Sequence, residues 1–359
     1  MTMKRKDIKT YCITVLCIVL VLCQSMQVSA RPITKTASEV VKEITIGWNL
    51  GNSFACCDSG MRNSNIPKTT YYETLWGNPV TTKQMIDKVK ATGFNAVRIP
   101  VTYYNHIDEQ GKIEATWLNR IAEVVDYCLD NDMYVIINMH HDTGYGKNKI
   151  MQANPNQLEA YKNYTKIVWH QVAAYFKNYD DRLMFEGFNE LLDMSAQNPW
   201  YGNDKSWETM NILNQTFVDI VRYTGGKNAT RNLLVSTYGA QTTYGPLSSF
   251  RMPEDTVENH LMVEVHYYGS DVKAVRGAMS EVNKYLVQKG YPVILGEFGT
   301  NRSCSMQYRV ASAANYITEA KQYGMKCFWW DDGGDYGLLN RKNCTWKYPE
   351  IVAAMMKVA

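Results

Sequence analysis

The chain has 359 residues, with 38 basic and 35 acidic side chains and a formal net charge of +3 at pH 7. Four of the basic residues and one acid lie in the first thirty positions, so residues 31–359 carry 34 charges of each sign. This balance does not favour nucleic acid or an anionic membrane as a partner, and a neutral partner suits it better. The length exceeds that of a usual single core but fits one α/β barrel with long loops.

The first thirty residues are predicted to be a signal peptide. A basic start at residues 4–9 precedes an apolar stretch over residues 11–23, and Val28-Ser29-Ala30 offers the small residues that signal peptidase recognises. The apolar stretch is too short for a comfortable membrane span. We therefore expect cleavage before Arg31, a mature protein without a membrane segment, and a secreted, extracellular location.

Six of the nine cysteines lie beyond this leader, and six cysteines allow fifteen disulfide connectivities. Cys304 and Cys344 fall in predicted loops and form the most plausible bridge in an oxidising compartment. Cys128 lies on the apolar face of a predicted helix and is expected to be a buried thiol. The sequence has no CxxC pair with a matching partner, so a structural zinc site is not indicated.

Short apolar and β-branched runs predict eight strands, at residues 44–50, 96–101, 134–141, 183–190, 233–237, 261–268, 292–299 and 326–332. Their nearly continuous apolar character is typical of a parallel sheet covered by helices. Helical spacing predicts helices at residues 82–91, 116–131, 158–175, 207–223, 275–286 and 310–323. This alternation predicts an α/β fold, a single-domain (β/α)8 TIM barrel over residues 31–359. A doubly wound open sheet is the alternative, but no glycine-rich phosphate loop opens the chain.

Polar and aromatic residues gather at the carboxyl ends of the predicted strands. In chain order they are Asn49, Arg98, His140, His141, Asn189, Glu190, His266, Tyr268, Glu297, Trp329 and Trp330. The carboxyl ends of barrel strands form one face, on which active sites of this fold are built. Residues distant in the sequence are therefore expected to surround one cavity.

Two of these residues are glutamates at the ends of the fourth and seventh predicted strands, which places Glu190 and Glu297 across the barrel mouth from each other. Cleavage of a glycosidic bond needs such a pair. One carboxyl group protonates the leaving oxygen, while the other attacks the anomeric carbon or activates water. Arg98 and Tyr268 are suited to keep the second carboxylate ionised.

Other polar and aromatic residues have simpler interpretations. Glu186 and Glu264 lie deeper on strands that carry site residues, so we expect buried partners of Arg98 or of a histidine. Residues expected to be structural or superficial are His106, His170, His260, Trp117, Trp169 and Trp207. Better candidates for stacking on sugar rings lie in strand-end loops, namely Trp76, Tyr145, Trp200 and Trp346. The expected cleft walls are residues 54–71, 143–156, 193–205 and 238–255.

Six motifs, in order along the chain, resemble those of glycoside hydrolase family 5. They are Gly47-Trp48-Asn49-Leu50-Gly51-Asn52, Gly93-Phe94-Asn95-Ala96-Val97-Arg98-Ile99-Pro100, His140-His141, Phe188-Asn189-Glu190, His266-Tyr267-Tyr268 and Gly296-Glu297-Phe298-Gly299. The opening motif, with Trp76-Gly77-Asn78-Pro79, is most similar to the subfamily 4 branch of bacterial and rumen endo-β-1,4-glucanases. Each motif alone is weakly specific, but six in this order are very specific and cover nearly all of residues 31–359.

The resemblance implies a role for each matching residue. Glu190 would be the acid/base and Glu297 the nucleophile of a retaining, endo-acting hydrolysis of β-1,4-glucosidic bonds in cellulose-type glucans. Asn189 would bind the 2-hydroxyl of the sugar in the −1 subsite, and Arg98 and Tyr268 would orient the nucleophile. The other substrate contacts would be His140, His266, Trp330 and, as secondary contacts, Asn49 and His141. Trp330 rather than Trp329 is chosen on its spacing to Tyr336-Gly337, and one residue of error is open.

The expected partner is a β-glucan polysaccharide, bound by a monomer without metal or other cofactor. Two other classes remain open. His140, His141 and Asp142 invite a metal-dependent hydrolase, although the other site residues are not a typical ligand set. A catalytically silent glycan-binding barrel would be favoured by loss of a carboxylate position, and both positions are present. Cellulose-type β-1,4-glucan is the first choice of substrate, and mixed-linkage β-glucan, xyloglucan and glucomannan are alternatives.

Overall fold

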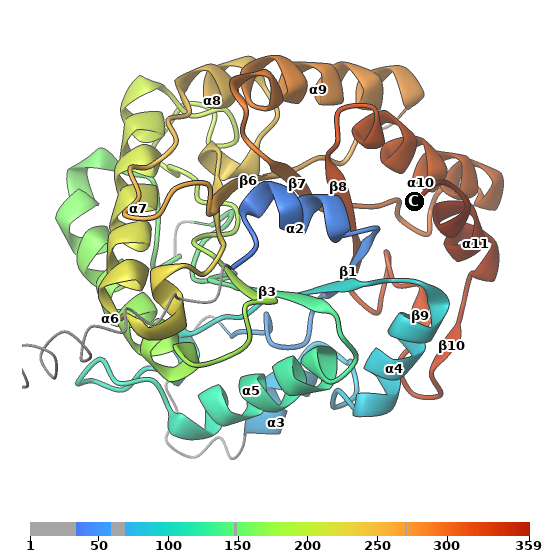
Figure 1. Ribbon diagram of the computed structural model, residues 1–359, viewed down its shortest axis with the longest axis horizontal. Helices are drawn as coiled ribbons and strands as arrows, with labels where there is room; N and C mark the ends of the chain where they lie inside the picture. The colour runs from blue at the N-terminus through green and yellow to red at the C-terminus, as the bar shows by residue number, and fades with distance from the viewer. Residues whose placement is uncertain (1–33, 59–68, 147–148, 270) are drawn as a thin grey trace, which may run out of the picture. The chain divides into compact units, whose positions relative to one another are not determined.

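Eight parallel strands close into a barrel in the order in which they occur in the sequence (Figure 1). The computed structural model describes residues 34–58, 69–146, 149–269 and 271–359. The strands are β1 (Gly47–Leu50), β2 (Ala96–Ile99), β3 (Tyr134–Asn138), β4 (Leu183–Glu186), β5 (Leu233–Ser236), β6 (Leu261–His266), β7 (Val293–Phe298) and β8 (Lys326–Asp331). The predicted (β/α)8 barrel is confirmed, whereas the predicted signal peptide lies outside the described residues.

Helices surround the barrel (Figure 1). The six predicted helices are present, with ends within four residues of the prediction: α4 (Lys83–Thr92), α5 (Ala115–Leu129), α6 (Leu158–Phe176), α7 (Asp204–Tyr223), α9 (Val272–Tyr285) and α10 (Met306–Lys321). Side-chain caps define some starts, because Asn203 and Asp271 accept hydrogen bonds from the first turns of α7 and α9.

Several short elements were not predicted. They are α2 (Ala37–Glu43), α3 (Thr69–Thr74), α8 (Tyr244–Ser249), α11 (Pro349–Val358), the hairpin of β9 (Leu339–Asn340) and β10 (Thr345–Trp346), and the 3-10 turns η1 (Tyr104–His106), η2 (Pro155–Gln157), η3 (Gly226–Ala229), η4 (Tyr238–Ala240) and η5 (Val287–Lys289). Most are too short to show a helical or strand period in sequence.

Helix α2 closes the amino-terminal end of the barrel and appears in the middle of the ring of helices (Figure 1). Thr36 and Glu39 form a capping box at its start, and the backbone N–H of Ala37 donates to the carbonyl of Asn259, just before β6. Its buried side chains pack with inward residues of the strands in one cluster, which includes Val40, Ala96, Ile136, Met184, Leu234, Met262, Ile294 and Phe328. The barrel interior is thus filled at its amino-terminal end, and the carboxyl ends of the strands lie at the opposite end.

Strands β3 and β4 end before their functional residues, and the predicted strand ends at residues 141 and 190 are wrong. The chain nevertheless stays beside its neighbour. The N–H of His140 donates to the carbonyl of Val101 at 2.7 Å, and the N–H of Asn189 donates to the carbonyl of Met139 at 2.9 Å. The site residues therefore lie on backbone that is held in place but has left the regular pleat.

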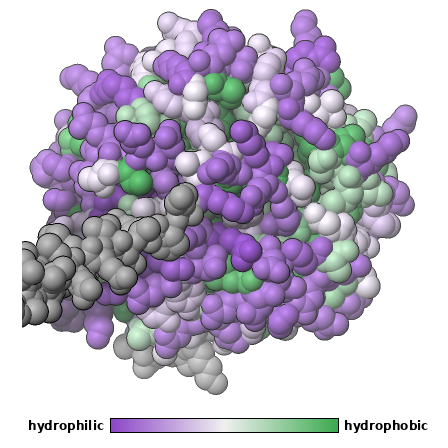
Figure 2. Space-filling model, viewed as in Figure 1, coloured by the Kyte–Doolittle hydropathy of each residue, from purple (hydrophilic) through white to green (hydrophobic). Residues whose placement is uncertain are grey.

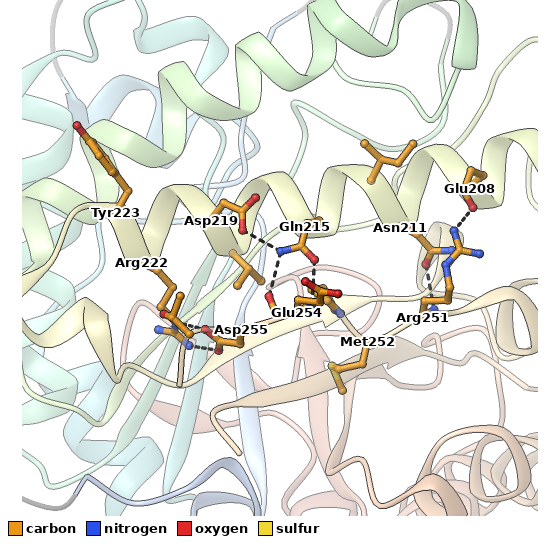
Figure 3. A pocket seen from close by; sticks show the side chains of 14 residues that line it. Glu208, Asn211, Gln215, Asp219, Arg222, Tyr223, Arg251, Met252, Glu254 and Asp255 are labelled. Carbon is orange, nitrogen blue, oxygen red and sulfur yellow. Dashed lines mark hydrogen bonds and ion pairs between the residues drawn. The ribbon is translucent and has the colours of Figure 1, made fainter. Parts of the chain in front are cut away.

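A groove of about 940 Å³ runs between the outer side of α7 and residues 251–256 (Figure 3). Arg222 binds Asp255 through two 2.7 Å hydrogen bonds, and Arg251 pairs with Glu208 across the groove. None of the predicted site residues lines it. Residues 251–255 were expected in a cleft wall, and that part of the prediction is wrong, because they lead into β6 on the outer surface.

The face of the molecule seen in Figure 2 is largely hydrophilic, and its hydrophobic residues form small scattered patches. Within the described ranges, none of the helices has the length and apolar character needed to cross a membrane.

The six cysteines of the described residues are all free thiols. The predicted Cys304–Cys344 bridge is therefore wrong: Cys304 lies in the loop between β7 and α10, whereas Cys344 lies in the turn between β9 and β10. Cys128 is fully buried, and that burial raises the pKa of its thiol, as expected for a packing residue.

Candidate active site

Arg98 lies at the centre of a buried polar cluster, and all five of its N–H groups have acceptors. Nε and Nη2 donate to the two carboxylate oxygens of Glu186 at 2.6 and 2.7 Å. Nη1 donates to Oε1 of Glu297 at 2.6 Å and to Oδ1 of Asn49 at 3.0 Å. Nη2 also donates to Oδ1 of Asn189 at 2.9 Å. One side chain on β2 thereby fixes residues from β1, β7 and the region of β4.

Burial alone would lower the pKa of Arg98, which has no solvent exposure. The negative charges of Glu186 and Glu297 outweigh this effect and raise the pKa well above its usual value. Glu186 is equally buried, so the predicted structural role of this glutamate as a partner of Arg98 is confirmed. An uncompensated charge at this depth would be strongly destabilising, so the two residues depend on each other.

Glu297 lies on a distorted part of β7. The pairing register shifts between Val265 and His266 on one side of β7, and again between Leu295 and Phe298 on the other. Such irregularities turn a side chain away from the direction that a regular pleat would give it. Oε1 of Glu297 accepts from Arg98 at 2.6 Å, and Oε2 accepts from the hydroxyl of Tyr268 at 2.8 Å. Both oxygens are thus held.

Tyr268 stays a neutral donor at this position. Loss of hydration around the hydroxyl, together with the negative charges of Glu297 and Glu190, raises the pKa of Tyr268 well above its usual value. Its ring also contacts Tyr336 edge-on, with centroids 5.6 Å apart. The hydroxyl therefore keeps its proton and keeps it directed at the carboxylate.

Glu190 follows β4, and its side chain is 22% exposed, against 6% for that of Glu297. Its Oε1 lies 3.0 Å from Nδ1 of His266, while Nε2 of the same ring lies 2.5 Å from Oε1 of Glu264. Glu264 is fully buried, so its predicted role as the partner of a histidine is confirmed.

The imidazole of His266 lies among three carboxylates. Burial by itself would lower the pKa of His266, but the charges of Glu264 and Glu297, the hydrogen bond with Glu190 and the close contact with Glu264 raise it well above its usual value. His266 is therefore an imidazolium at neutral pH, and its Nδ1–H donates to Glu190.

The two glutamates predicted to be catalytic are close together. One oxygen of Glu190 and one oxygen of Glu297 lie within 4.8 Å of each other. Two carboxyl groups at such a distance, one bound by two donors and the other more open to solvent, fit the division into nucleophile and proton donor.

His140 and His141 follow β3 and are both neutral. Burial and repulsion by nearby cationic groups lower the pKa of His140 well below its usual value, and burial and the charge of Lys149 lower the pKa of His141 to about 3. Asn138 lies 3.2 Å from Nδ1 of His140 through its amide nitrogen, which also donates to Glu186. Because Asn138 is the donor there, Nδ1 of His140 accepts and Nε2 carries the hydrogen.

Trp330 and Trp329 have different surroundings. Trp329 is fully buried and donates its indole N–H to the carbonyl of Tyr336 at 3.0 Å. Trp330 is partly exposed and stacks on His140, with ring centroids 5.6 Å apart and planes 12° apart. Trp330 is therefore the more exposed of the two, and its contact with a sugar stays a prediction.

Asn49 is completely buried. Its amide nitrogen lies within 3.3 Å of the carbonyls of Gly296, Phe328 and Trp329, and its oxygen accepts from Arg98. In this structure it fixes the backbone beneath the site, and a direct contact with substrate stays a prediction.

The predicted aromatic platforms fall into two groups. Trp76 is 43% exposed and lies beside His141, with centroids 5.4 Å apart. Tyr145 and Trp200, from the loops after β3 and β4, have parallel rings with centroids 6.1 Å apart. Trp346 was also predicted as a platform, and this is wrong: it packs on Phe94, just before β2, and donates its indole N–H to Thr92 at the end of α4. It therefore lies at the end of the barrel away from the site.

The residues predicted to be structural or superficial have those positions. Buried packing residues are His106, His260, Trp117 and Trp169, Trp207 is partly buried, and His170 is exposed. The ring of His106 stacks on Trp117 with centroids 3.7 Å apart, which leaves it no part in the site.

A metal ion has two candidate positions among the described residues. Oxygens of Glu190 and Glu297 and a nitrogen of His266 lie within 4.8 Å of one another, which is close enough for ligands. Arg98 and the cationic His266 already neutralise these carboxylates, so a divalent cation would meet two positive groups.

The second candidate position is the run of His140, His141 and Asp142. The two oxygens of Asp142 accept hydrogen bonds from the backbone N–H of Tyr103 and the hydroxyl of Tyr164. The carboxylate is therefore bound within the protein, which does not support the metal-dependent interpretation for these residues.

Sequence reasoning missed two residues that shape the site. Asn138 orients His140 and lies two residues before it on β3, and this N-x-H spacing was the available signal. Gly296 leaves the space that the carboxylate of Glu264 occupies: a Cβ at Gly296 would lie 2.1 Å from Oε1 of Glu264. Its signal was a glycine directly before a candidate nucleophile.

Comparison with known proteins agrees with this geometry. The family description "Cellulase (glycosyl hydrolase family 5)" matches residues 58–335. Endoglucanase B of Clostridium cellulovorans is 36% identical over 369 residues, which cover 94% of this chain and 79% of that protein. Endoglucanase A of Clostridium longisporum is 32% identical and covers 99% of this chain and 73% of that protein. Cellulase/esterase CelE of Acetivibrio thermocellus is 38% identical over 90% of this chain, but the chain spans only 40% of that protein's length.

Solved structures match across the barrel. The GH5-4 broad specificity endoglucanase from Ruminococcus champanellensis, with bound cellotriose, superposes with a TM-score of 0.84 at 39% identity and covers 90% of this chain and 100% of that one. PbGH5A from Prevotella bryantii B14, in complex with a xyloglucan tetradecasaccharide, has a TM-score of 0.83 at 33% identity. The match covers 91% of this chain and 99% of that one.

The barrel and its paired glutamates define a glycosidase, and the chain belongs to glycoside hydrolase family 5. Within that family it is an enzyme of the cellulase type that hydrolyses β-1,4-glucan, and its relatives are named endoglucanases.

Replacement of Gly296 tests the space beneath Glu297. In Gly296→Ala the new methyl group overlaps Glu264, so either that carboxylate or the backbone carrying Glu297 must move. A displacement of this size lowers kcat by about tenfold or more. Initial rates on carboxymethylcellulose measure the effect.

Gly277→Ala in α9 is the matched control, because a Cβ there has nothing within 4 Å. It should keep kcat and raise the free energy of unfolding in urea by up to about 1 kcal/mol. A Gly296→Ala enzyme with the wild-type kcat would show that the tight space has no functional consequence.

Proposed function

We propose that Glu190 and Glu297 hydrolyse the β-1,4-glucosidic bond by double displacement with net retention. The observation that carries this proposal is the separation of the two carboxylates, whose nearest oxygens lie within 4.8 Å. Retaining enzymes hold their carboxyl groups about 5–5.5 Å apart, whereas inverting enzymes leave about 6.5–9.5 Å for a water molecule. The short separation supports direct attack by one carboxylate.

In the first step, Glu297 attacks the anomeric carbon while Glu190 gives its proton to the departing glycosidic oxygen. The surroundings support this assignment. Arg98 and Tyr268 hold both oxygens of Glu297 in one orientation, and the more exposed Glu190 is open to a leaving group. Since Oδ1 of Asn189 accepts from Arg98, its amide N–H groups are the ones directed to an acceptor such as the 2-hydroxyl of the sugar.

In the second step, Glu190 takes a proton from water, which attacks the anomeric carbon and releases Glu297. The sugar lies against Trp330, whose ring is held by stacking on the neutral His140. Nε2–H of His140 is the donor available to a sugar hydroxyl. Each proton that leaves Glu190 in the first step is thus restored in the second.

The substrate is a β-glucan, with cellulose-type β-1,4-glucan first and xyloglucan, mixed-linkage β-glucan and glucomannan as further candidates. Exposed aromatic rings in the loops after β3 and β4, together with Trp76, support an extended cleft with several sugar subsites. Named structural relatives include a broad specificity endoglucanase, a lichenase with bound cellotetraose and an enzyme with bound xyloglucan, which supports a broad preference. Endo action accords with such a cleft, and the enzyme acts as a monomer.

The enzyme is secreted after removal of residues 1–30. The proposal rests on the basic start, the apolar stretch and the small residues before Arg31. An extracellular location also suits a polymer too large to enter a cell.

Chemical rescue distinguishes the two glutamates. Glu297→Gly should lose nearly all activity, and azide added with 2,4-dinitrophenyl β-cellobioside should yield the α-glycosyl azide, because azide enters the space of the nucleophile. Glu190→Gly should lose about 10²–10⁴-fold in kcat on polymer, where the leaving group needs a proton. With the activated substrate and azide it should yield the β-glycosyl azide. NMR of the products determines the anomer.

Exchanged anomers would reverse the two roles, and an initial α product from the wild-type enzyme would contradict retention. Turnover that is lost in EDTA and restored by a divalent cation would favour the metal-dependent interpretation instead.

Tyr145→Ala tests the platform formed with Trp200. Loss of one stacked ring should raise KM for the polymers by about tenfold, equivalent to about 1.4 kcal/mol. Hydrolysis of a short aryl cellobioside should be unchanged. Tyr223→Ala is the matched control, since this tyrosine is 79% exposed at the end of α7. Rates on carboxymethylcellulose, mixed-linkage β-glucan, xyloglucan and glucomannan give the preference, and an unchanged KM on all four would exclude the platform.

Expression of the full chain in a secreting bacterial host tests export. Mass spectrometry of the protein in the medium should give a new amino terminus at Arg31. Protein retained in the membrane fraction with residues 1–30 attached would contradict cleavage.

A further inference from the structure

Glu264 is a buried carboxylate that the proposed mechanism does not use. It lies on β6 without solvent exposure, and its space is provided by a neighbouring strand, where Gly296 has no side chain. Ser236 on β5 donates to its Oε2 at 3.1 Å, and its Oε1 lies 2.5 Å from Nε2 of His266. Three strands thus contribute to the placement of one negative charge behind the imidazole.

The other side of that imidazole faces the candidate catalytic groups. Nδ1 of His266 lies 3.0 Å from Oε1 of Glu190 and 3.7 Å from Oε2 of Glu297. The charged and titratable groups around the ring are Glu264 on β6, Glu190 after β4, Glu297 on β7, Tyr268 beyond β6, His140 after β3 and, behind Glu297, Arg98 on β2. His266 is the member whose protonation state decides which way its hydrogen bond to Glu190 runs.

The direction of that hydrogen bond determines where Glu190 holds its proton. A protonated His266 donates from Nδ1 to Oε1 of Glu190, so the acidic proton must lie on Oε2, the oxygen that is not bound to the ring. A neutral ring with its hydrogen on Nε2 would instead accept at Nδ1. The acidic proton would then lie on Oε1, directed at His266 and away from a glycosidic oxygen.

We propose that Glu264 is a positioning residue that keeps His266 protonated and thereby holds the catalytic proton of Glu190 on Oε2, facing the leaving group. The proposal rests on the proposed role of Glu190 as acid/base. In the second step the same hydrogen bond lets Oε2 accept the proton of the attacking water. His266 keeps its proton throughout, so no proton is lost into the barrel.

Arg98 offers a comparison within the same site. It also joins a buried glutamate, Glu186, to a catalytic one, Glu297. A guanidinium stays charged under all ordinary conditions, whereas an imidazole has an ordinary pKa of about 6.5 and loses its proton near neutral pH. The pKa of His266 is raised first by the charge of Glu264, against the opposing effect of burial. Glu264 therefore stabilises on His266 the positive charge that an arginine carries by itself.

Glu264→Gln tests this role because it removes the charge and keeps the shape. In this variant the pKa of His266 should be lower, so the ring should lose its proton at a lower pH. Activity should be retained below that pH and lost above it. The alkaline limb of kcat/KM should move down by about one pH unit or more, and kcat above that limb should fall by about tenfold or more. KM should change little, because Glu264 does not touch substrate.

NMR of the full chain with ¹³C/¹⁵N-labelled histidine gives a readout that is independent of activity. The chain has six histidines, so His266→Asn identifies the signal. The ring should stay an imidazolium between pH 5 and 8 in the wild type and titrate within that range in Glu264→Gln. Glu264→Asp keeps the charge and should restore much of the wild-type limb.

Glu73→Gln is the matched control, since Glu73 is equally buried and pairs with Arg120 away from the site. It should lower the free energy of unfolding without moving the pH profile. If Glu264→Gln does not fold, Ser236→Ala weakens the same carboxylate and should move the limb in the same direction by less.

An unchanged pH profile together with a cationic His266 in Glu264→Gln would overturn the inference. The same holds if the alkaline limb of kcat/KM lies at the same pH in Glu264→Gln and Glu264→Asp. Failure of the proposed function is a separate outcome, because it would appear as an active Glu297→Gly enzyme without azide.

Discussion

The site depends on one buried guanidinium. Arg98 has five N–H groups, and each has an acceptor from Glu186, Glu297, Asn49 or Asn189. Two of these acceptors belong to the groups proposed to touch the sugar, and the other two are wholly internal. A lysine could not replace this residue, because three donors on one nitrogen cannot hold two carboxylates and two amides in one plane. The position of Glu297 therefore follows from β2 as much as from β7.

The barrel gives these contacts their geometry. Strands pair in sequence order, so β2 and β7 are not neighbours, and only side chains that cross the barrel can join them. Such a crossing requires a core that is filled below the site, which α2 and the inward apolar residues provide. It also requires the shift of register at β7, without which Glu297 would follow the regular alternation of the strand.

Much of the fold and of the site could be predicted from the sequence, because the apolar runs that form strands and the polar residues at their ends are both local features. The apolar runs gave the eight strands, and the residues that end them included both glutamates, Arg98 and Tyr268. The predictions that were wrong concerned residues whose positions depend on contacts between distant segments of the chain. Trp346 lies in β10 of the short hairpin and packs on Phe94 at the end of the barrel away from the site, and Cys304 and Cys344 lie in separate loops. Helix α2 was not predicted, and its position across the barrel end depends on packing against strands that are distant in the sequence.

The pairing of charges gives a reason for four carboxylates around a proposed reaction that uses two. In the proposed mechanism Glu186, Glu264 and Glu297 are negative before reaction, Arg98 and His266 are positive, and Glu190 carries its proton, so the six groups sum to −1. In the proposed glycosyl-enzyme, Glu297 would lose its charge to the new bond and Glu190 would gain one by giving up its proton, so the sum is again −1. A constant negative charge suits a transition state in which the sugar ring becomes positive. The two internal glutamates set this sum, because Glu186 offsets the charge of Arg98 and Glu264 offsets the charge of His266.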